Sequence, residues 1–111
     1  ERFNLPDHIA CEFKLKSSIA RSGINHSLAG WADPTWHGST LTLELANVLQ
    51  HHQLVMQSGM KIGQISFHRM SSSVDRPYGS KSLRSRYQGQ SEPTASALHV
   101  DFDAVRRTTD R

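Results

Sequence analysis

From residue 40 to residue 45 polar and apolar side chains alternate strictly, and this alternation restricts the fold more than any other feature. Thr40, Thr42 and Glu44 alternate with Leu41, Leu43 and Leu45. Because successive side chains of a strand point to opposite faces, the pattern predicts a strand at residues 39–45 with its leucines on one face. Glu44 then shares the other face with the threonines. It is a solvated carboxylate if that face meets water, and a candidate base if the face lines a pocket.

Further short segments bounded by turn signals carry the β pattern along the chain. They predict strands at residues 9–13, 53–56, 60–70 and 99–102. Gly63, inside the third of these segments, predicts a bulge or a close approach of another part of the backbone. The sequence therefore indicates a mostly β domain in which helices are short.

The segment from Lys16 to Gly23 predicts one or two turns of helix. Ser17 or Ser18 suits the N-cap, and Gly23 suits the left-handed residue that closes a helix. In such a helix Ser17 and Arg21 lie four residues apart on one face. The helix start, the hydroxyl and the guanidinium then form an anion site, although an ordinary capped helix with a solvated arginine produces this pattern more often.

Two other segments are rich in groups that bind ligands. Residues 31–38 form a loop with two tryptophans, whose rings close over a ligand or, more often, cover the edge of a core. Residues 71–90 are polar and basic, and they end in a tyrosine, a glycine and two glutamines. Such a segment clamps a phosphate chain or forms a surface loop, and its composition favours the surface loop.

Length, charge and cysteine content exclude several classes of protein. The 111 residues allow one domain, and no apolar run approaches the roughly 20 residues that span a membrane. The single cysteine excludes a disulfide framework and a cysteine-based zinc site, and the seven histidines do not form a metal-binding set. The net charge of +3 forms no basic stripe, so nucleic acid is not an expected partner. With no visible leader segment, these features predict a cytoplasmic protein without a metal site of its own.

Seven motifs follow one another along the chain, at residues 1–7, 16–23, 29–38, 41–47, 59–64, 76–79 and 86–90. In this order they resemble the dCTP deaminases of the dUTPase-like superfamily. The resemblance covers residues 1–102 as one domain and leaves residues 103–111 as a charged tail. It implies a mostly β fold, a distorted β-barrel, which assembles as a homotrimer with active sites between subunits.

The resemblance also implies a reaction, the hydrolytic deamination of dCTP to dUTP. Water attacks C4 of the cytosine and ammonia leaves, without the zinc ion that other deaminases use. Magnesium enters only with the triphosphate of the substrate. Glu44 matches the general base of the family, which takes a proton from the water and passes it toward the leaving amine.

The same resemblance implies further site residues. Ser17, Ser18 and Arg21 match the group that holds the phosphates and orders the water, and Lys16 stands where the family usually has arginine. The other implied substrate-binding residues are Ala29, Asp33, Trp36, Tyr78, Arg86 and Gln90. The first two match a loop near the base and sugar, Trp36 matches an aromatic position that packs on deoxyribose, and the last three match a segment that folds over the triphosphate.

Departures from the family pattern leave two alternatives open. The loop at residues 23–30 is one residue shorter than usual, with Leu28 in place of threonine, and the N-terminal portion of the family fold is missing from the sequence. The first alternative is a dUTP pyrophosphatase or a bifunctional enzyme that makes dUMP from dCTP, because residues 29–33 resemble the loop of such enzymes. The glycine-rich final motif of ordinary dUTPases is missing, which counts against the pure pyrophosphatase. The second is a noncatalytic trimeric scaffold that binds nucleotides such as dUTP or dTTP.

Overall fold

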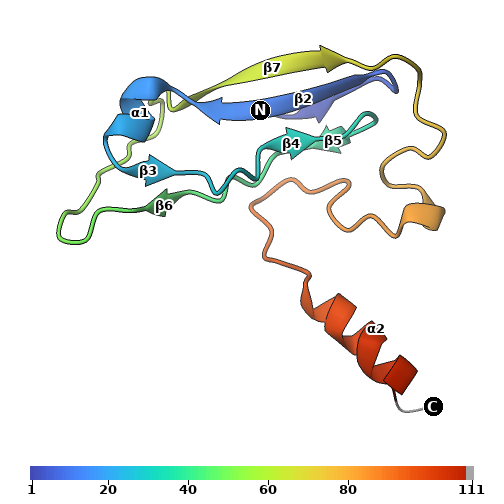
Figure 1. Cartoon of the computed structure of the whole chain (residues 1–111). Coiled ribbons are helices and arrows are strands. Elements are labelled where there is room, and N and C mark those ends of the chain that lie inside the picture. The colour runs from blue at the N-terminus through green and yellow to red at the C-terminus, as the bar shows by residue number, and fades with distance from the viewer. Residues whose placement is uncertain (110–111) are drawn as a thin grey trace.

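A seven-residue antiparallel ladder between β2 (Ile9–Leu15) and β7 (Gly63–Arg69) is the longest pairing in the computed structural model, which describes residues 1–109 (Figure 1). The sequence of β2 explains its place in the sheet. Cys11 and Phe13 are buried, whereas Glu12 between them is only partly buried and Lys14 is exposed. This alternation puts an apolar face on the core and a polar face toward water.

Short strands extend this ladder or pair beside it. β4 (Trp31–Ala32) joins the other edge of β2, β1 (Phe3–Asn4) pairs with β5 (His37–Ser39), and β3 (Ile24–Asn25) pairs with β6 (Ala46–Asn47). The helical segments are α1 (Ser17–Arg21), the 3₁₀ turn η1 (Lys81–Leu83) and α2 (His99–Thr109). The predicted β class is therefore confirmed, although the three sheets of residues 1–109 do not close into a barrel.

The core is small, and two tyrosines from the C-terminal half of the chain pack against it. Its buried cluster consists of Leu5, Cys11, Ala32 and Trp36. Partly buried residues pack against it, among them Tyr78 and Tyr87. Burial raises the pKa of the Cys11 thiol, so this free cysteine is a neutral, apolar part of the core.

Several predicted elements are confirmed with shifted ends. The strand expected at residues 9–13 runs two residues further, and the one expected at 60–70 begins at Gly63. The expected helix is α1, but its N-cap is Lys16 in extended conformation, without a side-chain cap, so neither Ser17 nor Ser18 serves as N-cap. Gly23 follows with φ +100°, the left-handed conformation predicted for the residue that closes the helix.

The strand predicted at residues 39–45 is wrong in its extent, and the strand predicted at residues 53–56 does not form. Of the first, only Ser39 belongs to a ladder, as the last residue of β5. Thr40 and Thr42 instead bond to the returning C-terminal segment, for example from Thr40 N to Gln90 O at 2.9 Å. Alternating side chains are not enough for a ladder, which also needs a neighbouring strand, and none of the described strands pairs here.

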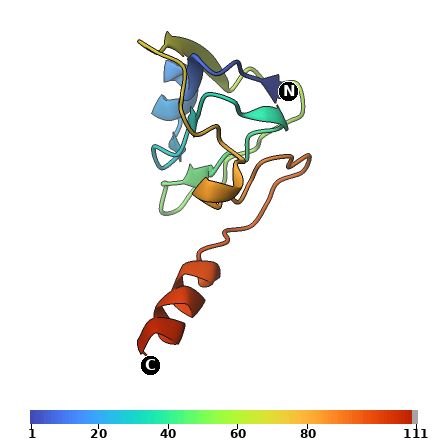
Figure 2. The ribbon, with the colours of Figure 1, turned by 90° about the vertical axis from the view of Figure 1, so that its right-hand side faces the viewer.

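The strand predicted at residues 99–102 is also wrong, because these residues begin α2. Leu98, Phe102 and Val105 follow each other at helical spacings of four and three, and Ser96 Oγ accepts a hydrogen bond from Leu98 N at 3.2 Å. The helix runs through the domain boundary expected at residue 102, and it extends away from the sheets (Figure 2). Among residues 1–109 no helix has the length and apolar character of a membrane span.

Gly63 confirms the close approach predicted at this position. A Cβ atom added there would overlap the ring of buried Phe13 and lie 2.9 Å from Lys14 O. We therefore expect Gly63→Ala to lower the free energy of unfolding by about 1–3 kcal/mol, as overpacking of a core does. Urea denaturation measures this change. Gln64→Ala, on an exposed neighbouring residue, is the control, and an equal loss in both variants would contradict the prediction.

Candidate functional site

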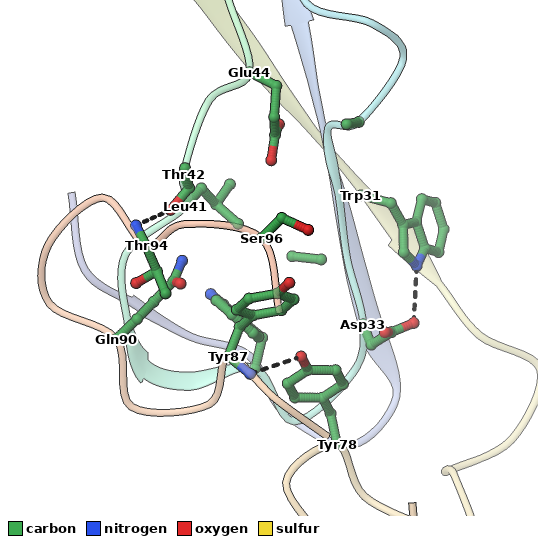
Figure 3. A pocket seen from close by; sticks show the side chains of 13 residues that line it. Trp31, Asp33, Leu41, Thr42, Glu44, Tyr78, Tyr87, Gln90, Thr94 and Ser96 are labelled. Atoms are coloured by element: carbon green, nitrogen blue, oxygen red, sulfur yellow. Dashed lines mark hydrogen bonds between the residues drawn. The ribbon is translucent and has the colours of Figure 1, made fainter. Parts of the chain in front are cut away.

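A pocket of about 410 Å³ lies where three stretches of chain meet (Figure 3). The first stretch holds β4 and its flanks, the second is the unpaired segment after β5, and the third returns from residue 78 to residue 96. The lining residues are Ala29, Trp31, Ala32, Asp33, Trp36, Leu41, Thr42, Glu44, Tyr78, Tyr87, Gln90, Thr94 and Ser96. Six of the eleven site residues implied by the family resemblance are among them.

Glu44 enters this pocket from its rim. Its side chain is exposed, and the carboxylate points toward the Ser96 hydroxyl (Figure 3). Thr42, two residues earlier, lines the same pocket, and its Oγ1 accepts a hydrogen bond from Thr94 N at 3.1 Å. Thr42 and Glu44 therefore both line a pocket, which was the condition for Glu44 to serve as a base, and Leu41 of the opposite predicted face lines it as well.

The base of the pocket is aromatic and contains two polar atoms without partners. Trp36 is 6% exposed, and its ring centroid lies 5.0 Å from that of Tyr78. Trp36 Nε1 and Gln90 Oε1 are buried and have no hydrogen-bond partner among the described residues. A buried donor or acceptor without a partner is costly, so this donor and acceptor favour a ligand that carries both kinds of group.

The acidic side of the pocket is held by a tryptophan. Trp31 Nε1 donates a hydrogen bond to Asp33 Oδ1 at 3.0 Å, and the Trp31 ring packs on His68 with centroids 5.5 Å apart. The expected loop around Trp31 is therefore partly a strand, β4, paired with β2. The pairing of β4 with β2 and the packing of Trp31 on His68 hold Trp31 in place, and Trp31 in turn holds Asp33 through Oδ1. This hydrogen bond does not use Oδ2 of the carboxylate.

The loop before β4 places Ala29 at the pocket in an unusual backbone conformation. Ser27 and Leu28 have φ angles of 53° and 59°, and Leu28 is 85% exposed. Left-handed conformations are uncommon for leucine. The turn is held by hydrogen bonds from Ser27 N to Asn25 Oδ1 at 2.7 Å and from Ala29 N to His26 O at 3.2 Å.

The predicted phosphate-binding residues of α1 lie elsewhere. Ser17, Ser18 and Arg21 are exposed on this helix, at the end of the β2–β7 ladder far from η1 (Figure 1). Lys16 lines a second hollow of about 760 Å³, together with residues of both ladder strands. None of these four residues lines the pocket that contains Glu44, although β3, which follows α1, pairs with β6 only two residues after Glu44.

Arg86 also lies outside the pocket, in contact with α2. Its guanidinium donates hydrogen bonds of 3.0 Å to Ala97 O and to Asp101 Oδ2, and it forms an ion pair with Asp101. The hydrogen bond from Arg86 holds the pKa of Asp101 below its usual value. A phosphate group would compete with Asp101 for the same donors.

Seven lining residues were not predicted as site residues by sequence reasoning. They are Trp31, Ala32, Leu41, Thr42, Tyr87, Thr94 and Ser96. The alternation that selects Glu44 also selects Thr42, and Tyr87 lies inside a motif of the resemblance. No periodicity marks Thr94 or Ser96, because they reach the pocket only through the hydrogen bonds of an irregular segment.

Metal-binding groups are sparse in this part of the molecule. Within residues 1–109 no three His, Cys, Asp or Glu side chains are placed together to hold a metal ion. The pocket offers two carboxylates, Asp33 and Glu44. These are hard oxygen ligands, of the type that magnesium prefers.

Comparison with known proteins gives a consistent result. A family model described as dCTP deaminase-like matches residues 1–70. A protein of Beutenbergia cavernae named "dCTP deaminase, dUMP-forming" is 50% identical over 103 residues, which cover 92% of this chain and 53% of the relative. Proteins with the same name are 48% identical in Clavibacter michiganensis (92% of this chain, 50% of the relative) and 45% identical in Corynebacterium efficiens (94% and 53%). The chain thus spans about half the length of the curated relatives it matches.

Proposed function

Because the chain belongs to the dCTP deaminase-like family, we propose that it forms the substrate pocket of an enzyme that deaminates dCTP. The observation that carries this proposal is the position of Glu44. Its carboxylate enters a pocket whose base holds an aromatic pair and whose buried donor and acceptor, Trp36 Nε1 and Gln90 Oε1, lack partners among the described residues. A nucleoside offers both an apolar sugar face and polar groups to such a pocket.

In the proposed reaction Glu44 acts as general base. Its carboxylate takes a proton from a water molecule while the water oxygen forms a bond to C4 of the cytosine ring. The proton then passes to the exocyclic amine, the C–N bond breaks, and ammonia leaves. One water is consumed for each dCTP, and the product of this step is dUTP.

The triphosphate requires cations that the pocket itself does not supply. We assign this role to Lys16, Ser17, Ser18 and Arg21 of a second copy of the chain, because none of these residues lines the Glu44 pocket of its own chain. A homotrimer with sites between subunits brings the two groups together. Magnesium accompanies the triphosphate in this proposal, so it needs no complete set of protein ligands.

We favour dUMP over dUTP as the final product. The relatives named above are all called dUMP-forming, which supports the bifunctional alternative. In this reaction a second water cleaves the bond between the α- and β-phosphates and releases pyrophosphate. Asp33 is the remaining carboxylate of the pocket and is the residue we assign to this second step.

Analysis of the products tests the proposal. The protein is incubated with dCTP and Mg²⁺, and nucleotides and pyrophosphate are separated by chromatography. We expect dUMP and pyrophosphate in equal amounts, with little accumulated dUTP. Accumulation of dUTP alone would show a deaminase without the second activity. A folded trimer that binds dCTP without turnover would instead identify a nucleotide-binding scaffold.

A further inference from the structure

The side chain of Gln88 makes three hydrogen bonds that join its own segment to two other backbone segments, at Thr35–His37 and at Tyr78. Its Nε2 donates hydrogen bonds to Thr35 O at 2.9 Å and to Tyr78 O at 3.2 Å. Its Oε1 accepts a hydrogen bond from His37 N at 3.2 Å. The amide nitrogen and the amide oxygen of Gln88 are thus both hydrogen-bonded. Their partners lie 53 (Thr35), 10 (Tyr78) and 51 (His37) residues away in the sequence.

These contacts enclose the aromatic pair of the pocket. Thr35 and His37 are the two sequence neighbours of Trp36, so Gln88 is hydrogen-bonded to the backbone on both sides of this tryptophan. The third contact is to the carbonyl of Tyr78, whose ring packs on Trp36. Gln88 therefore sets the position of Trp36 relative to Tyr78 although it does not line the pocket itself.

The surrounding backbone leaves room for this side chain. Gly79 has φ +91°, and a Cβ atom there would lie 2.8 Å from Gln88 Cγ. The residues after Gln88 continue the attachment, with Gly89 N donating to Ser39 Oγ at 2.6 Å and Gln90 Nε2 donating to Thr40 O at 2.7 Å. Gln88 is thus the first of three consecutive residues that fasten the returning segment across the pocket.

We infer that Gln88 is a positioning residue for the substrate, and this inference rests on the proposed function for the identity of the ligand. By fixing Trp36, Tyr78 and the start of the segment that carries Gln90, it holds the pocket in the shape that receives the nucleoside. The chemistry requires an amide. A carboxylate keeps the acceptor for His37 N but loses both donors and faces two carbonyl oxygens, and asparagine is one methylene too short to span the three partners.

The test compares Gln88→Glu and Gln88→Asn with the parent protein. Two quantities are measured, the hydrogen-exchange rate of the Gly89 amide and the dissociation constant of dCTP. Binding is measured in a Glu44→Gln background so that the nucleotide is not consumed. Gln57→Glu, which makes the same charge change on an exposed turn, is the matched control.

We expect exchange at Gly89 to accelerate and the dissociation constant of dCTP to rise, each by about tenfold, in both Gln88 variants. The control should change neither quantity. Faster exchange with unchanged dCTP binding would overturn the inference, because Gln88 would then serve only to fasten the chain. Unchanged exchange would overturn it as well. If the parent protein binds no dCTP, the proposed function fails, and the exchange arm still decides whether Gln88 holds the segment.

Discussion

Glu44→Gln is expected to lower kcat for dCTP deamination by about 10²–10⁴-fold, the usual contribution of a general base. Glutamine keeps the size and polarity of the side chain but cannot accept a proton from water. Because the Glu44 side chain is exposed, whereas the unpartnered Trp36 Nε1 and Gln90 Oε1 are buried, we expect dCTP to bind nearly as well as before. Release of ammonia under saturating dCTP measures kcat, and equilibrium binding of dCTP measures the affinity.

A second carboxylate provides the control for this variant. Glu92 is exposed and does not line the pocket, so Glu92→Gln makes the same change in charge on the same returning segment. It should retain nearly full activity. Glu44 would lose its assignment if the Glu44→Gln variant still deaminated dCTP within about threefold of the parent rate, far less than a general base contributes. A loss of dCTP binding in step with kcat would show that the carboxylate holds substrate and does not act as base.

The sequence predicts the faces of residues 40–45 only in part. Thr42 and Glu44 line the pocket and Leu43 lines the other hollow, but Leu41 lines both and Thr40 lines the hollow of Leu43. The alternation does not create a strand, because a ladder depends on the position of a second segment that the local sequence does not determine. Glu44 therefore lines the same pocket as Thr42, as predicted, whereas Thr40 does not, and the strand that motivated the prediction is largely absent.

The error at residues 99–102 has a different physical origin. Val100 and Phe102 alternate with His99 and Asp101, which satisfies a period of two over four residues. A segment this short fits more than one period, and the helical spacing becomes visible only when Leu98 and Val105 are included. The helix then prevails, with the Ser96 hydroxyl beside its start and Asp101 in its first turn.

The arrangement of the candidate site could not be predicted from local sequence patterns. Nothing in the sequence near residues 35–37 indicates that Gln88 bonds to the backbone of Thr35 and His37, because these bonds depend on the path of an irregular segment about 50 residues later. Through resemblance to a family, the motif order identified six of the residues that line the pocket. It also grouped the α1 residues with Glu44, but none of them lines the Glu44 pocket of the same chain.

Because the α1 residues do not line the Glu44 pocket of their own chain, we predict that variants of the two groups complement each other. If α1 of one subunit completes the Glu44 pocket of another, two inactive variants can restore activity when they are mixed. Arg21→Ala removes the guanidinium that we assign to the phosphates, and we expect it to lower activity by about 10–100-fold, the effect of one lost charged hydrogen bond. Glu44→Gln leaves α1 intact. In random trimers of equal amounts, about one site in four combines an intact pocket with an intact α1.

We therefore expect the mixture, after exchange of subunits, to regain about a quarter of the parent activity. Native mass spectrometry confirms that mixed trimers have formed before ammonia release is measured. The matched control mixes Glu44→Gln with Glu44→Ala. Both variants lack the same carboxylate, so no combination of subunits restores an intact pocket, and activity should stay low. Mixed trimers without recovered activity in the first pair would show that one chain supplies both groups, and the shared-site arrangement would then be wrong even if Glu44 is the base.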